Sequence, residues 1–265
     1  MFWRAPTAGL AIVVALSALT VSALIVQKPL TIAEVQGSGS STPLAGQTVT
    51  VEGVVTADLR GDDSYGGVYI QSPEETDIAG ASDGIFVAVT EKVDDIADGD
   101  LVSVTGEAAE AHGETQIIAS SVSLVEPGVG VPVATDLPDG TDPADLESFE
   151  GMLVEPVGTY TLSSLADLGT TGSIEITDDY GSTFTIDDGY TTPIAGERPF
   201  LPADVTPEPG SPFTAPAIPM VLGHSANGYV LLPSEPVDSE SNPDLSPSFD
   251  GGSFTLGSAP QLQAP

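Results

Sequence analysis

Apolar and polar residues alternate in two closely similar segments, Gly46–Gly53 (GQTVTVEG) and Gly99–Gly106 (GDLVSVTG). Each segment opens on a glycine and a polar residue and closes on a second glycine. Strict alternation is typical of a strand with one buried face and one solvent-exposed face. A closing glycine allows the bend by which a long strand takes part in both sheets of a small closed barrel. The pattern therefore predicts an all-β barrel.

The same pattern predicts five strands in a first module, residues 46–126. They are Gln47–Ala57, Val68–Ser72, Gly84–Thr90, Asp100–Glu107 and Glu114–Ala119, the last extended by Ser121–Val125. One helical turn is expected at 93–98, between the third and fourth strands. Five short strands with a helical turn in this place match an oligonucleotide/oligosaccharide-binding (OB) barrel more closely than a β-sandwich. We therefore expect an OB-fold-like five-stranded barrel.

The rest of the chain divides into segments of different composition. Residues 27–45 are a lead-in, and residues 127–145 form a linker rich in Pro, Gly and Asp. A second, smaller β-rich module is expected at 146–237, because its apolar runs resemble short strands. These runs are 146–154, 160–162, 172–177, 182–186 and 228–232. Residues 238–265 are polar and proline-rich, which predicts a disordered tail.

Residues 1–26 have the composition of an export signal. Arg4 is the first charged side chain, and Ala8–Val26 is apolar except for one glycine and a few hydroxyl residues. The small-residue stretch Val21–Ala23 fits a signal-peptide cleavage site. Uncleaved, the run at 8–26 is long enough to cross a bilayer as a hydrophobic anchor helix. Signal peptide and signal anchor both stay open, and both predict an extracellular or cell-surface protein.

The charge balance is strongly acidic, with 39 Asp and Glu residues, five Lys and Arg residues and a formal net charge of -34. After residue 26 the basic residues are Lys28, Arg60, Lys92 and Arg198. Affinity for nucleic acid comes chiefly from Lys and Arg side chains that displace counterions from phosphates. Strong independent binding to DNA or RNA is therefore not expected. The charge is interpreted as a soluble, self-repelling surface.

Several motifs recur in a fixed order along the chain. They are Thr31–Gly37, Leu44–Thr56, Val68–Pro73, Ser82–Val87, Gly99–Gly106 and Leu146–Val154. In this order they resemble the N-terminal OB-like region of large extracellular bacterial nucleases. In that family the region precedes a metal-dependent catalytic domain of the endonuclease/exonuclease/phosphatase superfamily. The resemblance spans residues 31–240.

The resemblance implies a fold and an accessory context, but no catalytic residue. Asn242-Pro243 stands where the family's chain would continue into its catalytic domain, and the given sequence holds no Ser-Phe-Asn strand of the kind that opens that domain. The chain by itself is therefore not expected to be an enzyme. The resemblance implies a nuclease catalytic domain, or weakly bound single-stranded nucleic acid, as the partner.

Four residues are candidates for ligand binding on the first module. Tyr65, Tyr69 and Phe86 fall on the second and third predicted strands and the loop before them. In OB barrels this face stacks bases or sugar rings on aromatic side chains. Arg60 is close enough in sequence to reach a phosphate there. The alternative for Tyr69 and Phe86 is packing in or beside the core.

No residues indicate a metal site or a catalytic group. The two histidines, His112 and His224, belong to different predicted modules, and the absence of cysteine excludes thiolate ligands. Paired aspartates recur at 62–63, 94–95, 178–179 and 187–188, without the spacing of a calcium loop. We interpret these pairs as solvated turns, with weak Ca²⁺ or Mg²⁺ association as the alternative. No cofactor is expected, and no serine-nucleophile or phosphate-loop motif occurs.

Three functions from different classes remain, and the least favoured is an enzyme whose site cannot be read from the sequence. The first is an exported, non-catalytic OB-like accessory module that positions a nuclease domain or contacts nucleic acid weakly. The second is a cell-surface scaffold or adhesion protein that binds glycan or protein.

Overall fold

The computed structural model describes most of residues 28–234 and two short segments near the C-terminus. The described residues are 28–61, 63–89, 93, 96–167, 169–191, 209–210, 212–213, 219–225, 228–234, 249–250 and 253–254. The predicted hydrophobic helix of residues 8–26 lies outside this set. Among the described residues, no helix is long and apolar enough to cross a bilayer. The predominance of strand confirms the all-β prediction.

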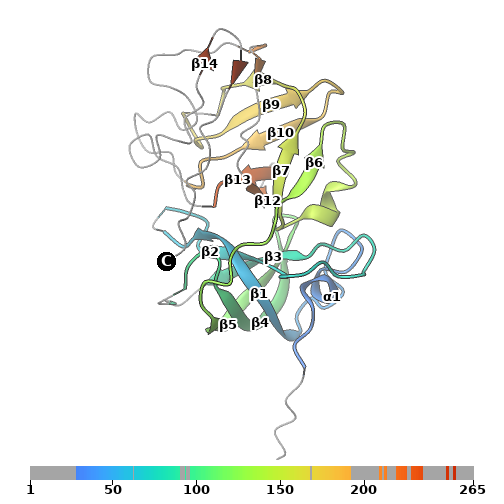
Figure 1. Cartoon of the computed structure of the whole chain (residues 1–265), viewed down its shortest axis with the longest axis vertical. Helices are drawn as coiled ribbons and strands as arrows, with labels where there is room; N and C mark the ends of the chain where they lie inside the picture. Colours follow the sequence, from blue (N-terminus) through green and yellow to red (C-terminus); the bar gives the residue numbers. More distant parts are fainter. Residues whose placement is uncertain are drawn as a thin grey trace, which may run out of the picture.

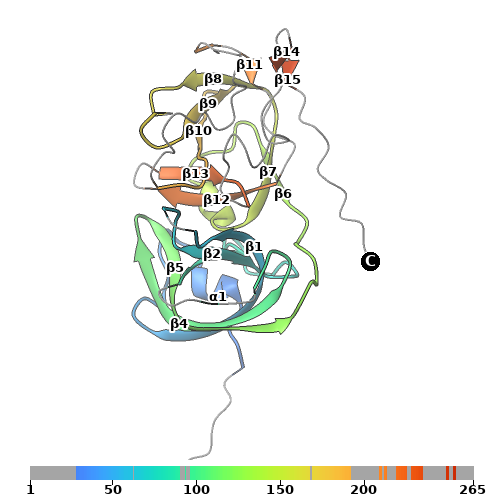
Figure 2. The same cartoon turned by 90° about the vertical axis from the view of Figure 1, so that its left-hand side faces the viewer.

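Five strands close into a barrel in the first module (Figures 1 and 2). They are β1 Thr48–Leu59, β2 Gly67–Gln71, β3 Gly84–Val89, β4 Leu101–Ala111 and β5 Glu114–Glu126. Their order around the ring is β1-β2-β3-β5-β4, and β4 pairs with β1 to close it. β3 and β5 run parallel, whereas the other neighbours are antiparallel. Each predicted strand of this module is present, and β1, β4 and β5 extend beyond their predicted ends.

The two repeated segments pair with each other, as parts of β1 and β4. Their alternating valines, such as Val51 and Val104, are fully buried in the barrel core. The closing glycines are sites of close approach. A Cβ atom on Gly106 would lie 2.3 Å from the carbonyl oxygen of Ile118, where the register of β4 and β5 shifts. Gly106 is therefore required by the irregular pairing of two strands.

A short helix that the sequence analysis missed lies in the lead-in. Helix α1, Ile32–Gln36, begins at a capping box: Glu34 N donates to Thr31 Oγ1 at 3.1 Å, and Thr31 N donates to Glu34 Oε2 at 2.8 Å. This reciprocal pair satisfies amides that a helix start leaves open. Ile32 and Val35 are buried in the barrel core, and α1 packs against β1 and β3.

The helical turn predicted at 93–98 is absent from the described residues of that segment, Val93 and 96–98. The carbonyl of Val93 would accept from Ala97 in a helix. It accepts instead from Arg60 Nη1 at 2.6 Å, while Ala97 N donates to Asp100 Oδ2 at 3.0 Å. Arg60 and Asp100 thus take the place of the Ala97-to-Val93 hydrogen bond that a helical turn would have.

The second module is an eight-stranded sheet in the order β11-β8-β9-β10-β13-β12-β7-β6. Its strands are β6 Thr135–Pro138, β7 Leu153–Val157, β8 Tyr160–Ser164, β9 Ile174–Asp178, β10 Thr183–Ile186, β11 Pro212–Phe213, β12 Met220–Ser225 and β13 Gly228–Leu232. It has more strands than the barrel, but they are shorter on average. Each is six residues or shorter.

Three parts of the second half differ from the sequence-based expectations. The predicted linker contains β6, which pairs in parallel with β7. The opening segment 146–154 begins as a 3-10 helix, Leu146–Phe149, because a turn at Gly151 (φ +72) separates it from β7. β12 follows the proline-rich stretch and was not predicted. The predicted disordered tail lies outside the described residues apart from β14 Phe249–Asp250 and β15 Ser253–Phe254, which pair with each other.

The barrel and the sheet each have a core, and a third apolar cluster lies between them. The barrel contributes Ala57, Leu59, Tyr69 and Phe86; the sheet contributes Leu153, Val221, Val230 and Leu232. All eight residues are buried. Because burying one such side chain stabilises by about 1.5–3 kcal/mol, this cluster holds the two modules together (Figure 2).

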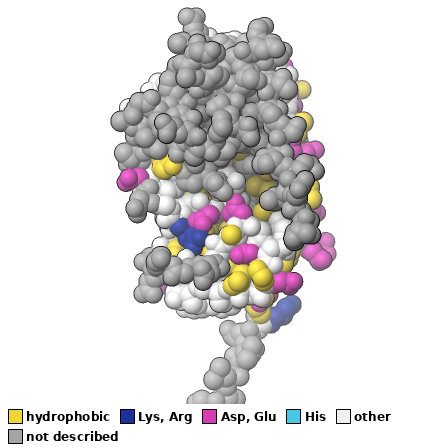
Figure 3. Space-filling model, turned by 60° about the vertical axis from the view of Figure 1, so that its left-hand side comes forward, with side chains coloured by type: hydrophobic (Ala, Val, Ile, Leu, Met, Phe, Trp, Pro, Cys, Tyr) yellow, Lys and Arg dark blue, Asp and Glu magenta, His cyan; other side chains and the backbone are white. Residues whose placement is uncertain are grey.

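The surface reflects the acidic composition. Figure 3 shows Asp and Glu side chains spread over one face of the described part, with basic side chains in few places. Lys28 and Arg60 are the basic residues among those that the structure describes.

Candidate functional site

Tyr69 and Phe86, two of the predicted ligand-binding residues, lie at the interface between the barrel and the second sheet. Tyr69 is fully buried and Phe86 is 6% exposed. Their ring centroids lie 4.9 Å apart at an interplanar angle of 55°. Both rings belong to the apolar cluster shared with the sheet. A nucleobase stacks only on an open ring face, and in this structure the sheet covers these faces.

Gly223 of β12 allows the sheet to approach Tyr69 closely. A Cβ atom at Gly223 would lie 2.3 Å from the Tyr69 hydroxyl oxygen and 2.8 Å from Leu232 Cδ1. Since no larger residue fits here without displacing the tyrosine, this glycine is part of the interface.

Tyr65 lies beside the same cluster and is half-buried. Burial raises the pKa of its phenol, and the charge of Asp187, to which its hydroxyl hydrogen-bonds, raises it further. Ser64, the preceding residue, donates from Oγ to the carbonyl of Gly189 at 2.6 Å. The loop between β1 and β2 is therefore attached to the end of β10.

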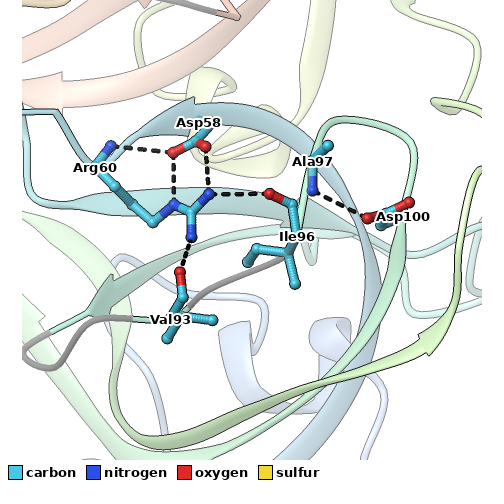
Figure 4. Close-up of polar contacts among 6 residues, drawn as sticks. All are labelled: Asp58, Arg60, Val93, Ile96, Ala97 and Asp100. Carbon is cyan, nitrogen blue, oxygen red and sulfur yellow. Dashed lines mark hydrogen bonds and ion pairs between the residues drawn. The ribbon is translucent and has the colours of Figure 1, made fainter.

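Arg60 is partly buried and bonds to Asp58 and to the segment before β4 (Figure 4). Its Nε and Nη2 atoms donate to the two carboxylate oxygens of Asp58 at 2.7 and 2.5 Å. Nη1 donates to the carbonyl of Val93 at 2.6 Å, and Nη2 also donates to the carbonyl of Ile96 at 3.0 Å. The guanidinium thus fixes the segment before β4. The structure brings Tyr65, Tyr69 and Phe86 together and places Arg60 in a different network.

Two buried glutamates at this interface were missed by the sequence analysis. Glu114 is 7% exposed, and its Oε1 accepts from the Tyr69 hydroxyl at 2.8 Å. Glu150 is fully buried, and its Oε1 accepts from the Thr115 amide at 2.9 Å. Burial raises the pKa of Glu114 and of Glu150 to about 8 in each case. Both carboxyls are therefore mainly neutral at pH 7, and a neutral carboxyl both donates and accepts hydrogen bonds.

Further titratable groups from both modules surround this pair. The charges of Glu110 and Glu147 help to raise the pKa of Glu150. The Tyr229 hydroxyl donates to Glu147 Oε2 at 2.7 Å, and its ring lies 4.8 Å from the ring of His224. Burial, followed by the bond to Glu147, raises the pKa of Tyr229. Across the described residues, no three His, Asp or Glu side chains are grouped so as to hold a metal ion.

Other polar groups join the modules through the backbone. Gln71 Oε1 accepts from the Leu153 amide at 2.8 Å, and Ser82 Oγ donates to the Glu150 carbonyl at 2.5 Å. Gly84 and Gly151 are in such close contact that a Cβ on Gly84 would lie 2.1 Å from the Gly151 carbonyl carbon. Together with Glu114 and Glu150, these groups form an interface network. It satisfies most of these buried polar groups, whereas Glu150 Oε2 has no hydrogen-bond partner among the described residues.

The two histidines come from separate modules, as expected. In the folded chain, however, the His224 ring lies against Gly113, the residue that follows His112. His112 sits in the tight β4–β5 turn at a positive φ of 57°. The ring of His224 packs on the next residue, Gly113, where an added Cβ would lie 2.9 Å from His224 Cε1. The β4–β5 turn is therefore covered by the end of β12.

Of the paired aspartates that the structure describes, Asp63 and Asp179 are exposed as a solvated turn predicts, whereas Asp178, Asp187 and Asp188 are buried. Asp187 and Asp188 are 7% and 2% exposed and accept from the amides of Gly189 and Tyr190. Burial raises the pKa of Asp187 to about 6. Burial raises the pKa of Asp178, but the amides of Gly140, Ser182 and Tyr180 donate hydrogen bonds that lower it. The hydrogen bonds have the larger combined effect, so the pKa of Asp178 is lowered. Asp62, Asp94 and Asp95 lie outside the described residues.

A signal for one of the missed glutamates was present in the sequence. Glu150 interrupts the apolar run Phe149–Val154, and a charged residue inside such a run indicates a buried, partnered group. Glu114 starts a strand after a Gly turn and carries no such signal, because its burial depends on the second sheet.

No family model matches this chain, and no curated protein matches it.

Proposed function

We propose that this chain is an exported, non-catalytic accessory module, built on an OB-type barrel, that positions a partner domain such as a nuclease. In this proposal the barrel face that other OB barrels use for ligands serves to hold the chain's own second sheet. The role is therefore mechanical: the two modules form one rigid unit of fixed shape.

The strand arrangement supports the OB-type assignment. An OB barrel is a small five-stranded Greek-key barrel. Here the ring order β1-β2-β3-β5-β4, with a parallel pairing of β3 with β5, gives a five-stranded Greek-key connection. The nuclease-like context rests on the ordered motifs of residues 31–240, and the export on the composition of residues 1–26.

The observation that carries the proposal is the covering of the usual ligand surface. In OB barrels that surface consists of strands 2 and 3 and the loops between strands 1–2 and 4–5. Tyr69 on β2 and Phe86 on β3 are buried under the sheet, Ser64 in the first loop bonds to Gly189, and Gly113 in the second loop contacts His224. All four parts of the surface are thus engaged within the chain.

Electrostatics supports the same conclusion. Stacking contributes about 1–3 kcal/mol per base, and no open aromatic platform is available on this face. The net charge of -34 repels a polyanion, and Arg60 is bonded to Asp58. A nucleic acid would therefore have to be held by the partner.

The test combines localisation and binding. The full chain, tagged at its C-terminus, is expected outside the cytoplasm after fractionation of a bacterial host. A fluorescent single-stranded oligonucleotide at low salt is expected to show no change in anisotropy with the purified chain, with or without Ca²⁺. The proposal would be wrong if the chain stayed in the cytoplasm, bound the oligonucleotide at physiological salt, or cleaved it in a metal-dependent manner.

A further inference from the structure

Exposed apolar side chains are concentrated in one stretch of the chain, between the second half of β5 and the start of β6. They are Leu124, Val125, Val129, Val131 and Val133, with Ile118 in the first half of β5 also exposed. Val131 is 50% exposed and Val133 is 91% exposed. Single exposed apolar residues are normal on a protein surface, whereas a contiguous group of them marks an interaction surface. The group in residues 124–133 needs an explanation of this kind.

The backbone of the same stretch is only partly paired. In the connector, residues 127–134, Gly128 N donates to Asp100 Oδ1 at 2.7 Å and Gly130 N donates to the Gly99 carbonyl at 3.1 Å. These bonds attach the first half to the start of β4. Val131 and Val133 make no backbone hydrogen bond to another described residue, and Pro132 between them has no amide to donate. Figures 1 and 2 show the connector running along the outside of the molecule from β5 to β6.

The connector continues directly into the edge of a sheet. β6 is the last strand of the eight-stranded sheet and pairs with β7 on one side only, within the described residues. Val131 and Val133 lie on either side of Pro132 and lead into β6, whereas Gly130 (φ +92) turns the chain between Val129 and Val131. An unpaired edge with exposed apolar side chains accepts an added strand from another chain.

The charges around this edge indicate which charge the added strand should carry. Glu126 precedes the connector, and Asp136 is exposed on β6. The described residues hold 2 basic side chains, Lys28 and Arg60, neither of which is in this stretch. An acidic incoming segment would be repelled, whereas a basic one is attracted.

We infer that residues 131–138 form a docking edge for a partner protein's extended segment in which apolar and basic residues alternate. The segment adds as a strand, its apolar residues covering the valines and its basic residues facing Glu126 and Asp136. This inference rests on the proposed accessory function, since it names the surface by which the partner is positioned.

The experiment uses the purified full chain and synthetic capped peptides. An alternating lysine–valine peptide is titrated into isotope-labelled protein while amide shifts are recorded by NMR. Shifts are expected at residues 128–138. A lysine–serine peptide tests charge alone, a glutamate–valine peptide tests apolar contact alone, and a backbone N-methylated lysine–valine peptide tests the strand hydrogen bonds. All three are expected to bind at least about tenfold more weakly.

Variants locate the surface. Val131→Ser combined with Val133→Ser leaves the net charge unchanged. This double variant is expected to bind the lysine–valine peptide at least about tenfold more weakly than the parent chain does. Ile78→Ser, at an exposed apolar residue far from the connector in sequence, is the matched control and is expected to leave binding unchanged. Equal binding of the lysine–serine peptide, or equal weakening by Ile78→Ser, would overturn the inference.

Two further outcomes would also overturn it. If the chain alone forms a dimer in sedimentation that the two serine substitutions abolish, a second copy occupies the edge instead. If acidic lipid vesicles bind there in preference to the peptide, the occupant is not a protein segment. The localisation and oligonucleotide measurements described above decide the accessory function separately, because none of them depends on residues 131 and 133.

Discussion

The hydroxyl group of Tyr69 on β2 donates a hydrogen bond of 2.8 Å to Glu114 at the start of β5, directly beneath Gly223 of the second sheet. Two strands of the barrel thus share a buried polar contact that the sheet seals from solvent. The aromatic residue that the sequence suggests as a ligand platform is thereby a structural element of the interface.

Removing this hydroxyl should destabilise the chain. Tyr69→Phe leaves the ring in the apolar cluster but deprives Glu114 of its partner, and an unsatisfied buried group costs about 1–3 kcal/mol. We expect the free energy of unfolding in urea to fall by that amount. Tyr180→Phe is the control, because Tyr180 is 75% exposed. An equal effect of both substitutions would contradict the role given to Tyr69.

Gly223→Ala should also loosen the interface, by steric conflict. The added methyl group would lie 2.3 Å from the Tyr69 hydroxyl oxygen, and overpacking of this kind costs about 1–3 kcal/mol. Gly39→Ala is the control, since an added Cβ there meets nothing within 4 Å. Because Tyr69→Phe removes the atom in closest conflict, the double variant should lose less stability than the sum of the two single variants. Additive losses would show that the two residues do not interact.

The stability of the chain should decrease as the pH rises. Glu114 and Glu150 have pKa values of about 8 in the folded chain, raised chiefly by burial from an ordinary value of 4.5. The folded state therefore holds protons that the unfolded state has released, so stability is full below pH 4.5 and is lost as the pH rises through 8. Each glutamate contributes a slope of at most about 1.4 kcal/mol per pH unit.

Urea unfolding of the chain at several pH values between 5 and 9 measures this decrease. Self-repulsion of the many surface carboxylates acts in the same direction, so the comparison must be made with neutral variants. Glu114→Gln and Glu150→Gln, separately and together, should each flatten the dependence. A dependence as steep in the double variant as in the parent chain would mean that the two glutamates are ionised in the folded state.

Arg60 should stabilise the segment before β4 rather than hold a ligand. Arg60→Ala removes the donors to the Val93 and Ile96 carbonyls. We expect faster proteolysis within 93–98 and a loss of about 1–2 kcal/mol in unfolding free energy. Arg60→Lys keeps the charge but not the bidentate geometry and should restore only part of the protection. Any residual affinity for a single-stranded oligonucleotide should be the same in all three chains, whereas a selective loss in Arg60→Ala would return Arg60 to a binding role.

Local patterns predicted the barrel strands well, because each depends on its own alternation. β1 and β4 follow from their alternating valines, and the capping box Thr31–Glu34 would have predicted α1 had it been weighed. The turn predicted at 93–98 is absent from its described residues, Val93 and 96–98, where Arg60, more than thirty residues away, bonds to the carbonyl of Val93. β6 was not predicted, because the composition around it is typical of a linker. Its four residues form a strand by pairing with β7.

The sequence by itself determined the all-β class, the five barrel strands and the acidic surface, because period-two alternation and charge are properties of neighbouring residues. Only the tertiary structure decided which faces are open. Tyr69, Phe86, Glu114 and Glu150 are buried because the second sheet lies on the barrel, and burial is a relation between segments far apart in the chain. The same packing that covers Tyr69 and Phe86 leaves the connector's valines exposed beside β6, which among the described strands pairs with β7 alone.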